Sequence, residues 1–108
     1  MAFIRSILSK GKLTTDSSGN IYNPSSGEIG LVHNIVLFNG NTSAENIVIS
    51  LNDGTNDYVL FKIGLSADDT YILDFGGEGM VIPYGYTLKG YTTTADTVNY
   101  VIFGTKEI

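Results

Sequence analysis

Residues 46–64 read NIVISLNDGTNDYVLFKIG and contain the pattern that decides the fold. Two runs rich in Val, Ile, Leu, Tyr and Phe, residues 46–51 and 58–64, flank a polar stretch that contains Asp53-Gly54. β-Branched and aromatic residues suit the pleated surface of a strand. An Asp-Gly pair supplies the positive φ angles that a tight hairpin turn requires. The stretch therefore predicts two strands joined by a short turn.

The same alternation of apolar runs and turn signals continues along most of the chain. Turn signals recur about every 8–12 residues, which is the spacing of sandwiches and barrels. No segment shows the periodicity of an amphipathic helix. With 108 residues and no Cys, the chain is expected to form one domain without disulfides, an all-β, two-sheet sandwich of jelly-roll or immunoglobulin-like topology. Further strands are expected at residues 30–38, 70–75, 80–82, 87–91 and 97–103.

Charge divides the sequence into two parts. Residues 1–27 carry three basic residues and one acidic residue, a net of +2, whereas residues 28–108 carry three basic and ten acidic residues, a net of −7. The first part is also rich in Ser, Thr, Gly and Asn. We therefore predict an N-terminal arm with a first short strand over 1–27 and a sandwich body over 28–108. The arm residues expected to dock on a sister subunit or on a larger structure are Phe3, Ile4, Arg5, Ile7, Leu8, Lys10 and Lys12.

Several of the predicted strands are apolar on both faces. In the last one, Tyr100 and Ile102 share one face, while Val101 and Phe103 share the other. A sandwich buries only one face of each sheet, and a large exposed apolar patch usually marks an interaction site. We expect the second face to be covered by the arm, by sister subunits or by a larger assembly. The residues expected deep in the core are Val36, Leu51, Phe61, Leu73, Val98 and Ile102.

The sequence contains no motif that points to catalysis, a cofactor or a metal ion. His33 is the only histidine, and we expect it to have a structural role. Residues 53–57 (DGTND) lack the Gly and Glu positions of a calcium loop and are expected to form a hydrogen-bonded turn. Asp68 and Asp69 are adjacent, so in an extended segment their side chains point to opposite faces.

The chain is also not expected to bind nucleic acid or to enter a membrane. Its net charge is −5, whereas nucleic-acid-binding domains usually carry a basic surface. No apolar run reaches the roughly 18 residues that a membrane-spanning helix needs, and the first residues do not resemble a secretory signal.

Tyr84, Tyr86 and Tyr91 leave a second class of function open. Exposed and coplanar tyrosine rings could stack on sugars, which would make the chain a carbohydrate- or receptor-binding module. The competing interpretation is that these rings pack across strands or within an interface. Glycan binding by a monomer would support the binding module, and an oligomeric mass would support a structural role.

Residues 20–53, NIYNPSSGEIGLVHNIVLFNGNTSAENIVISLND, resemble a pattern of small β-sandwich virion proteins of tailed bacteriophages. In that pattern a Tyr and a Pro, in this chain Tyr22 and Pro24, precede a small-residue turn at Gly27. Two apolar strands then follow, separated by a polar turn at Thr42-Ser43.

The resemblance extends over residues 20–108 and includes MVIPYGYTL at residues 80–88. It implies an accessory structural part of a phage particle, such as a capsid decoration or cement protein, a head-fibre base, or a neck or tail component. Its partners would be the major capsid protein or neck and tail proteins. The resemblance further implies a homo-oligomer, with a trimer favoured, that has no enzymatic activity. Its location would be the virion, after assembly in the host cytoplasm.

Overall fold

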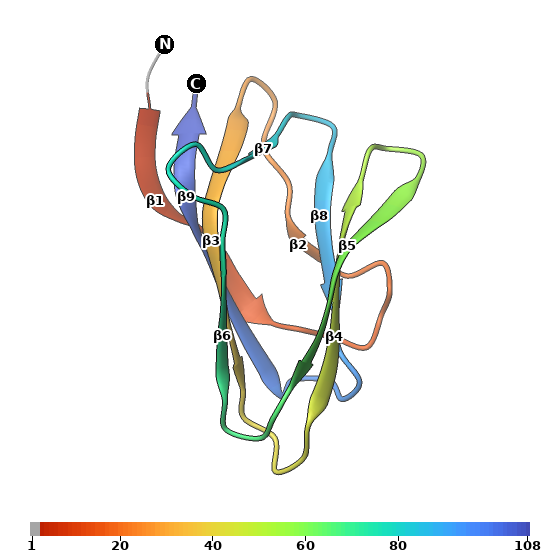
Figure 1. The fold of residues 1–108 in the computed structure, drawn as a ribbon. Helices are drawn as coiled ribbons and strands as arrows, with labels where there is room; N and C mark the ends of the chain where they lie inside the picture. Colours follow the sequence, from red (N-terminus) through yellow and green to blue (C-terminus); the bar gives the residue numbers. More distant parts are fainter. Residues whose placement is uncertain (1–2) are drawn as a thin grey trace.

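The computed structural model arranges the chain as one long antiparallel hairpin that is rolled into two facing sheets (Figure 1). It describes residues 3–108, with side chains from residue 6 onward. Within this part of the chain the strands are β1 (Phe3–Lys12), β2 (Asn20–Tyr22), β3 (Ile29–Asn39), β4 (Glu45–Asn52), β5 (Asp57–Leu65), β6 (Thr70–Asp74), β7 (Met80–Ile82), β8 (Thr87–Tyr91) and β9 (Val98–Glu107).

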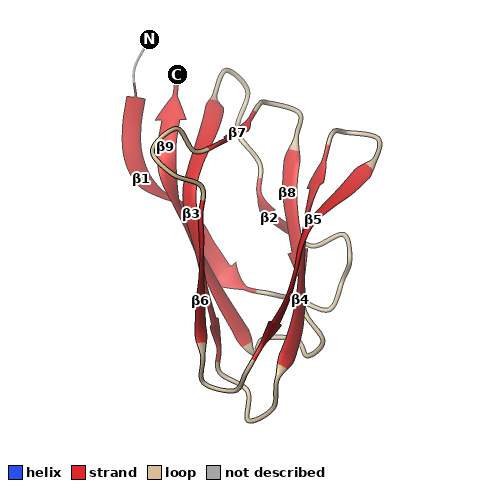
Figure 2. Ribbon diagram, viewed as in Figure 1, coloured by secondary structure: helices blue, strands red, loops and turns tan. Residues whose placement is uncertain are grey.

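The strand pairing identifies the topology. β4 pairs with β5, β3 with β6, β2 with β8 and β1 with β9, and all these pairs are antiparallel. The larger sheet has the order β1-β9-β3-β6, with the short β7 also paired to β3, and the smaller sheet has the order β2-β8-β4-β5 (Figure 2). This order is that of a jelly roll, in which two Greek keys wrap around one core. The predicted all-β, two-sheet sandwich is therefore confirmed.

The hydrophobic core lies between the two sheets, and buried residues alternate with outward-facing ones along each strand. In β3, for example, Ile35 and Leu37 are fully buried, whereas Phe38 is exposed. The buried apolar side chains are Leu13, Ile21, Tyr22, Val32, Ile35, Leu37, Ile47, Ile49, Ile63, Leu65, Leu73, Ile82, Leu88, Val98, Tyr100 and Ile102.

The core prediction is confirmed for Leu73, Val98 and Ile102, which are buried. It is wrong for Val36, which is only half-buried. The pairing of β3 with β9 shifts register between Val32 and Asn34, and this bulge moves the following residues to the opposite face. Leu51 and Phe61 are also half-buried and pack against the edge of the core.

The structure places residues 3–12 in the larger sheet, and this differs from the predicted N-terminal arm. Their backbone pairs with β9 from Phe3 opposite Glu107 to Lys12 opposite Asn99, so the two ends of the chain lie side by side (Figure 1). The pairing satisfies peptide groups along one edge of β9. Leu13 then enters the core. A boundary after residue 27 therefore does not separate two structural units.

Candidate functional site

Apolar side chains cover much of the outer face of the larger sheet, the face that points away from the core. Directly paired residues of antiparallel strands point to the same face. One row of paired residues crosses four strands: Lys10, Val101, Val36 and Ile72. The rows on either side of it are Lys12, Asn99, Phe38 and Thr70, and Ile7, Phe103, Asn34 and Asp74.

Four apolar members of these rows are exposed to solvent, and Val36 and Val101 between them are half-buried. Ile72 is 59% exposed and Ile7 is 52% exposed, and the rings of Phe103 and Phe38 are 38% and 37% exposed. Val98, Tyr100 and Ile102, on the other face of the same strand as Phe103, are buried. The prediction that the last strand is apolar on both faces is therefore confirmed, and its second face is uncovered in the single chain.

A groove of about 840 Å³ opens on this outer face. The loop of residues 75–79, which connects β6 to β7, forms one wall through Gly77, and β1 forms the other. The groove is lined by Ser6, Ile7, Leu31, His33, Gly77, Phe103, Gly104 and Thr105.

His33 holds the loop of residues 75–79 against the sheet. Its Nε2 lies 3.0 Å from the Thr105 hydroxyl, and its Nδ1 lies 3.3 Å from the Gly76 carbonyl oxygen. The backbone N–H of Phe75 donates to the His33 carbonyl at 2.9 Å. These contacts agree with the structural role expected for His33, and they make the loop a raised feature of the outer face.

The two edges of the larger sheet carry opposite charge. The β1 edge is basic, because residues 1–15 include three basic residues and no acidic one, a net of +3. The β6 edge is acidic, because residues 66–79 include four acidic residues and no basic one, a net of −4. β1 and β6 are the two ends of the strand order. The charged residues of the two edges are Arg5, Lys10 and Lys12, and Asp68, Asp69, Asp74 and Glu78.

The outer face of the smaller sheet is more polar. Ser50 pairs with Lys89 on one side and with Val59 on the other, and Lys89 pairs in turn with Asn20. Val59 is 57% exposed and lies near the end of β5 with its exposed neighbours Tyr58 and Leu60. This smaller apolar group lies at a bulge beside the β4–β5 turn and is not part of a continuous apolar face.

The residues expected to form a docking arm are divided between two environments. Ile7, Lys10 and Lys12 are exposed, and Lys12 donates to the side-chain oxygen of Asn99 at 2.9 Å. Leu8, at a bulge in β1, is half-buried and packs against the core. The side chains of residues 3–5, the predicted Phe3, Ile4 and Arg5, lie outside the described part of the structure.

The three tyrosines of the possible ligand surface do not share one platform. Tyr84 is exposed in the turn between β7 and β8, whereas Tyr86 is half-buried and packs against the core. Tyr91 lies at the far end of β8, where it pairs with Val48 of β4. Because β8 extends its residues by about 3.3 Å each, Tyr84 and Tyr91 are too far apart to stack on one sugar ring.

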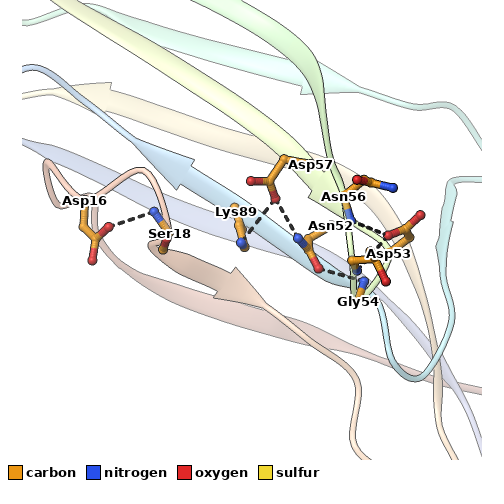
Figure 3. A network of polar contacts seen from close by, with 9 residues as sticks. Asp16, Ser18, Asn52, Asp53, Gly54, Asn56, Asp57 and Lys89 are labelled. Carbon is orange, nitrogen blue, oxygen red and sulfur yellow. Dashed lines mark hydrogen bonds and ion pairs between the residues drawn. The ribbon is translucent and has the colours of Figure 1, made fainter.

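The acidic turn between β4 and β5 is satisfied by its own hydrogen bonds (Figure 3). The Asp53 carboxylate accepts from the backbone N–H of Asn56 at 2.8 Å and of Thr55 at 2.9 Å, and these bonds lower the pKa of Asp53. Asp57 accepts from the Asn52 side chain at 2.7 Å and lies 3.2 Å from the Lys89 ammonium, and these contacts lower its pKa. The expected hydrogen-bonded turn is confirmed.

Glu45 is a buried carboxylate that the sequence did not single out. It is 2% exposed and accepts from the Thr92 hydroxyl and the Thr94 N–H, both at 2.8 Å, and from the Asn41 side chain at 3.0 Å. Burial alone raises the pKa of Glu45, but the donors of Thr94, Thr92 and Asn41 outweigh it and lower the pKa to about 2. Glu45 therefore links the loop between β3 and β4 to the loop between β8 and β9, and its role is structural.

Metal-binding clusters and membrane-spanning helices do not occur in the described residues. Within residues 3–108 no three or more His, Asp or Glu side chains lie close enough together to hold a metal ion. The same part of the chain contains no helix that could cross a membrane.

The chain matches no protein-family model, and no curated protein matches it significantly.

Proposed function

We propose that this chain is a structural, non-catalytic component of a tailed bacteriophage particle. It acts as a homo-oligomer that binds capsid, neck or tail proteins of the particle. The observation that carries the proposal is the uncovered apolar face of the larger sheet, with Ile72, Ile7 and Phe103 exposed. An apolar face of this kind is typical of protein–protein contact and is unfavourable to leave in water.

The jelly-roll fold is compatible with this role, and the sequence resemblance supplies the phage context. Jelly rolls occur in viral capsid proteins, and they occur equally in lectins, so the fold alone does not choose between a structural and a sugar-binding role. The separation of Tyr84, Tyr86 and Tyr91 favours the structural role, because a sugar-stacking platform needs neighbouring exposed rings.

The test is the protein composition of the particle. Particles of the phage that encodes the chain are purified on a density gradient, washed in high salt, and analysed by quantitative mass spectrometry. We expect the chain in a fixed ratio to the major capsid protein or to a neck or tail protein. Its presence only in the unassembled fraction of the lysate would contradict the proposal.

A further inference from the structure

We propose that two copies of this chain bind each other through the outer faces of their larger sheets, about a two-fold axis parallel to the strands. The inference deepens the proposed function, and it rests on that function only in treating the outer face as a protein-binding surface. It assigns this face to a second copy of the chain and specifies how the two copies are oriented. Three features of the outer face carry it: its shape, its charge and its size.

The shape of the outer face is self-complementary. The loop of residues 75–79 is raised above the sheet, because it lies against the outward-facing His33 (Figure 1). The groove lies beside this loop at the same height along the strands, because Gly77 of the loop is one of its lining residues together with Ile7 and Phe103. Rotation about a two-fold axis parallel to the strands leaves the position of each residue along the strands unchanged and exchanges the two edges of the sheet. The loop of each copy is thereby placed over the groove of the other.

The charge distribution selects the same axis. When the two edges are exchanged, the basic β1 edge of one copy meets the acidic β6 edge of the other. Lys12 and Thr70 lie in one row of paired residues, so Lys12 comes near Asp69 of the second copy, and Lys10 comes opposite Ile72, one row from Asp74. A two-fold axis across the strands would place β1 on β1, with basic residues facing basic ones. Opposite charges at the rim guide docking and disfavour this second arrangement.

The size of the face reaches the lower limit for a specific contact. Four strands about 4.8 Å apart, over about eight residues of about 3.3 Å each, present a face on the order of 500 Å² per copy. Two copies would bury about 1,000 Å² in total, which is at the lower limit for a specific interface. The apolar centre formed by Val36, Val101 and Phe103 on the two middle strands matches the usual anatomy of an apolar core within a polar rim. The two-fold contact is also closed, so assembly stops at two copies.

The first test measures the mass of the purified full chain by light scattering and analytical ultracentrifugation. We expect a particle of two chains. Ile72→Ser should weaken the association at least about tenfold, because it replaces the most exposed apolar side chain of the face with a hydroxyl. Val59→Ser is the matched control, since Val59 is 57% exposed, close to the 59% of Ile72, but lies on the smaller sheet. Far-UV circular dichroism should show that both variants remain folded.

These measurements can overturn the inference in three ways. A mass of one chain at the highest soluble concentration excludes the dimer, and a mass of three chains excludes the two-fold axis. If Val59→Ser weakens the dimer as much as Ile72→Ser does, the outer face of the larger sheet is not the contact surface.

The second test exchanges charge between the two edges. One variant carries Lys10→Glu and Lys12→Glu, and the other carries Asp69→Lys and Glu78→Lys. Asp74 is left unchanged because its carboxylate accepts from the Gly76 N–H at 2.9 Å and supports the loop. The first variant changes the net charge of residues 1–15 from +3 to −1, which sets two acidic edges against each other, and the second changes that of residues 66–79 from −4 to 0, which removes the attraction. Each variant alone should therefore dimerise more weakly than the parent. Mixed together, they should form a heterodimer, because the acidic β6 edge of the first variant then faces the basic β1 edge of the second, and the acidic β1 edge of the first faces the lysine-substituted β6 edge of the second.

The heterodimer is measured by native mass spectrometry of the two variants, one of them isotope-labelled. A statistical mixture, or homodimers as strong as those of the parent, would overturn the edge-to-edge arrangement. These results are separable from the proposed function. A chain that is absent from phage particles but dimeric in solution removes the proposed function and keeps the dimer, and a monomer found in particles does the reverse.

Discussion

Gly104 illustrates how a single residue sets the distance between two strands. It lies in β9 opposite Val32, and a Cβ atom at this position would overlap the carbonyl oxygen of Leu31. The obstacle is backbone in a central strand, which cannot turn aside as a flexible side chain can. The close approach of β9 and β3 therefore requires a glycine at position 104.

The first prediction tests this close approach. Gly104→Ala should lower the free energy of unfolding by about 1–3 kcal/mol, because the added methyl group forces β9 and β3 apart. Gly64→Ala is the control, since the nearest atom to a Cβ there is the Asn46 Oδ1 at 3.8 Å, and it should change the free energy by less than about 0.5 kcal/mol. Urea denaturation measures both values. Equal effects of the two substitutions would contradict the tight packing of β9 on β3 at Gly104.

The second prediction concerns Glu45 and acid. Its pKa is about 2 in the folded chain and near the ordinary 4.5 in the unfolded chain, so the folded state favours the ionised form. The resulting stabilisation is fully present above about pH 4.5 and is lost as the pH falls toward 2. Thermal melts from about pH 6 down to about pH 2 should therefore show falling stability.

Glu45→Gln provides the control for this prediction. It should cost about 1.5–3 kcal/mol at neutral pH, because the three donors lose a charged acceptor. It should also flatten the fall in stability between pH 4.5 and 2, since the titrating group is gone. A variant with the same acid dependence as the parent would show that Glu45 is not its source.

At the level of the strand, β1 contributes both to the core and to the outer face of the larger sheet. Its two sides differ, because Leu8 packs against the core while Ile7 is 52% exposed on the outer face. The charge and composition of residues 1–27 do not distinguish these positions. Pairing with β9 does, since it fixes the direction of each side chain.

The third prediction separates the two sides of β1. Leu8→Ser should lower the free energy of unfolding by about 1–3 kcal/mol, because it removes apolar contacts with the core. Ile7→Ser should change it by less than about 0.5 kcal/mol and act mainly on association. Both are measured by denaturation at one low protein concentration. If Ile7→Ser proved the more destabilising of the two, Ile7 rather than Leu8 would be the core residue and the orientation of β1 would be wrong.

At the scale of the whole molecule, association should be visible in thermal stability. Binding of a second folded copy stabilises the folded state by mass action, so the melting temperature should rise with protein concentration. For a domain of this size the rise should be about 3 °C per tenfold increase in concentration. Ile72→Ser should remove the dependence, and Val59→Ser should retain it. Scanning calorimetry over a range of concentrations measures this fourth prediction, which a concentration-independent parent would contradict.

Some features of the outer face could be predicted from the sequence and others could not. The two-faced character of the last strand could be read from the alternation of Tyr100 and Ile102 with Val101 and Phe103. The contribution of Ile72 was missed, although the alternation of Thr70, Ile72 and Asp74 around the buried Leu73 contains the signal. The position of Val36 could not be predicted, because a bulge between Val32 and Asn34 changes the face of every later residue in β3.

The fold class, the positions of most strands and the β4–β5 turn follow from the sequence, because these depend on neighbours within a few residues. The jelly-roll order, the place of β1 and the opposite charges of the two sheet edges appear only in the folded chain. These depend on pairings between distant residues, such as Ile7 with Phe103, and a local pattern allows many such pairings. The pairings that form are those that let the whole chain satisfy its backbone hydrogen bonds and bury one common core.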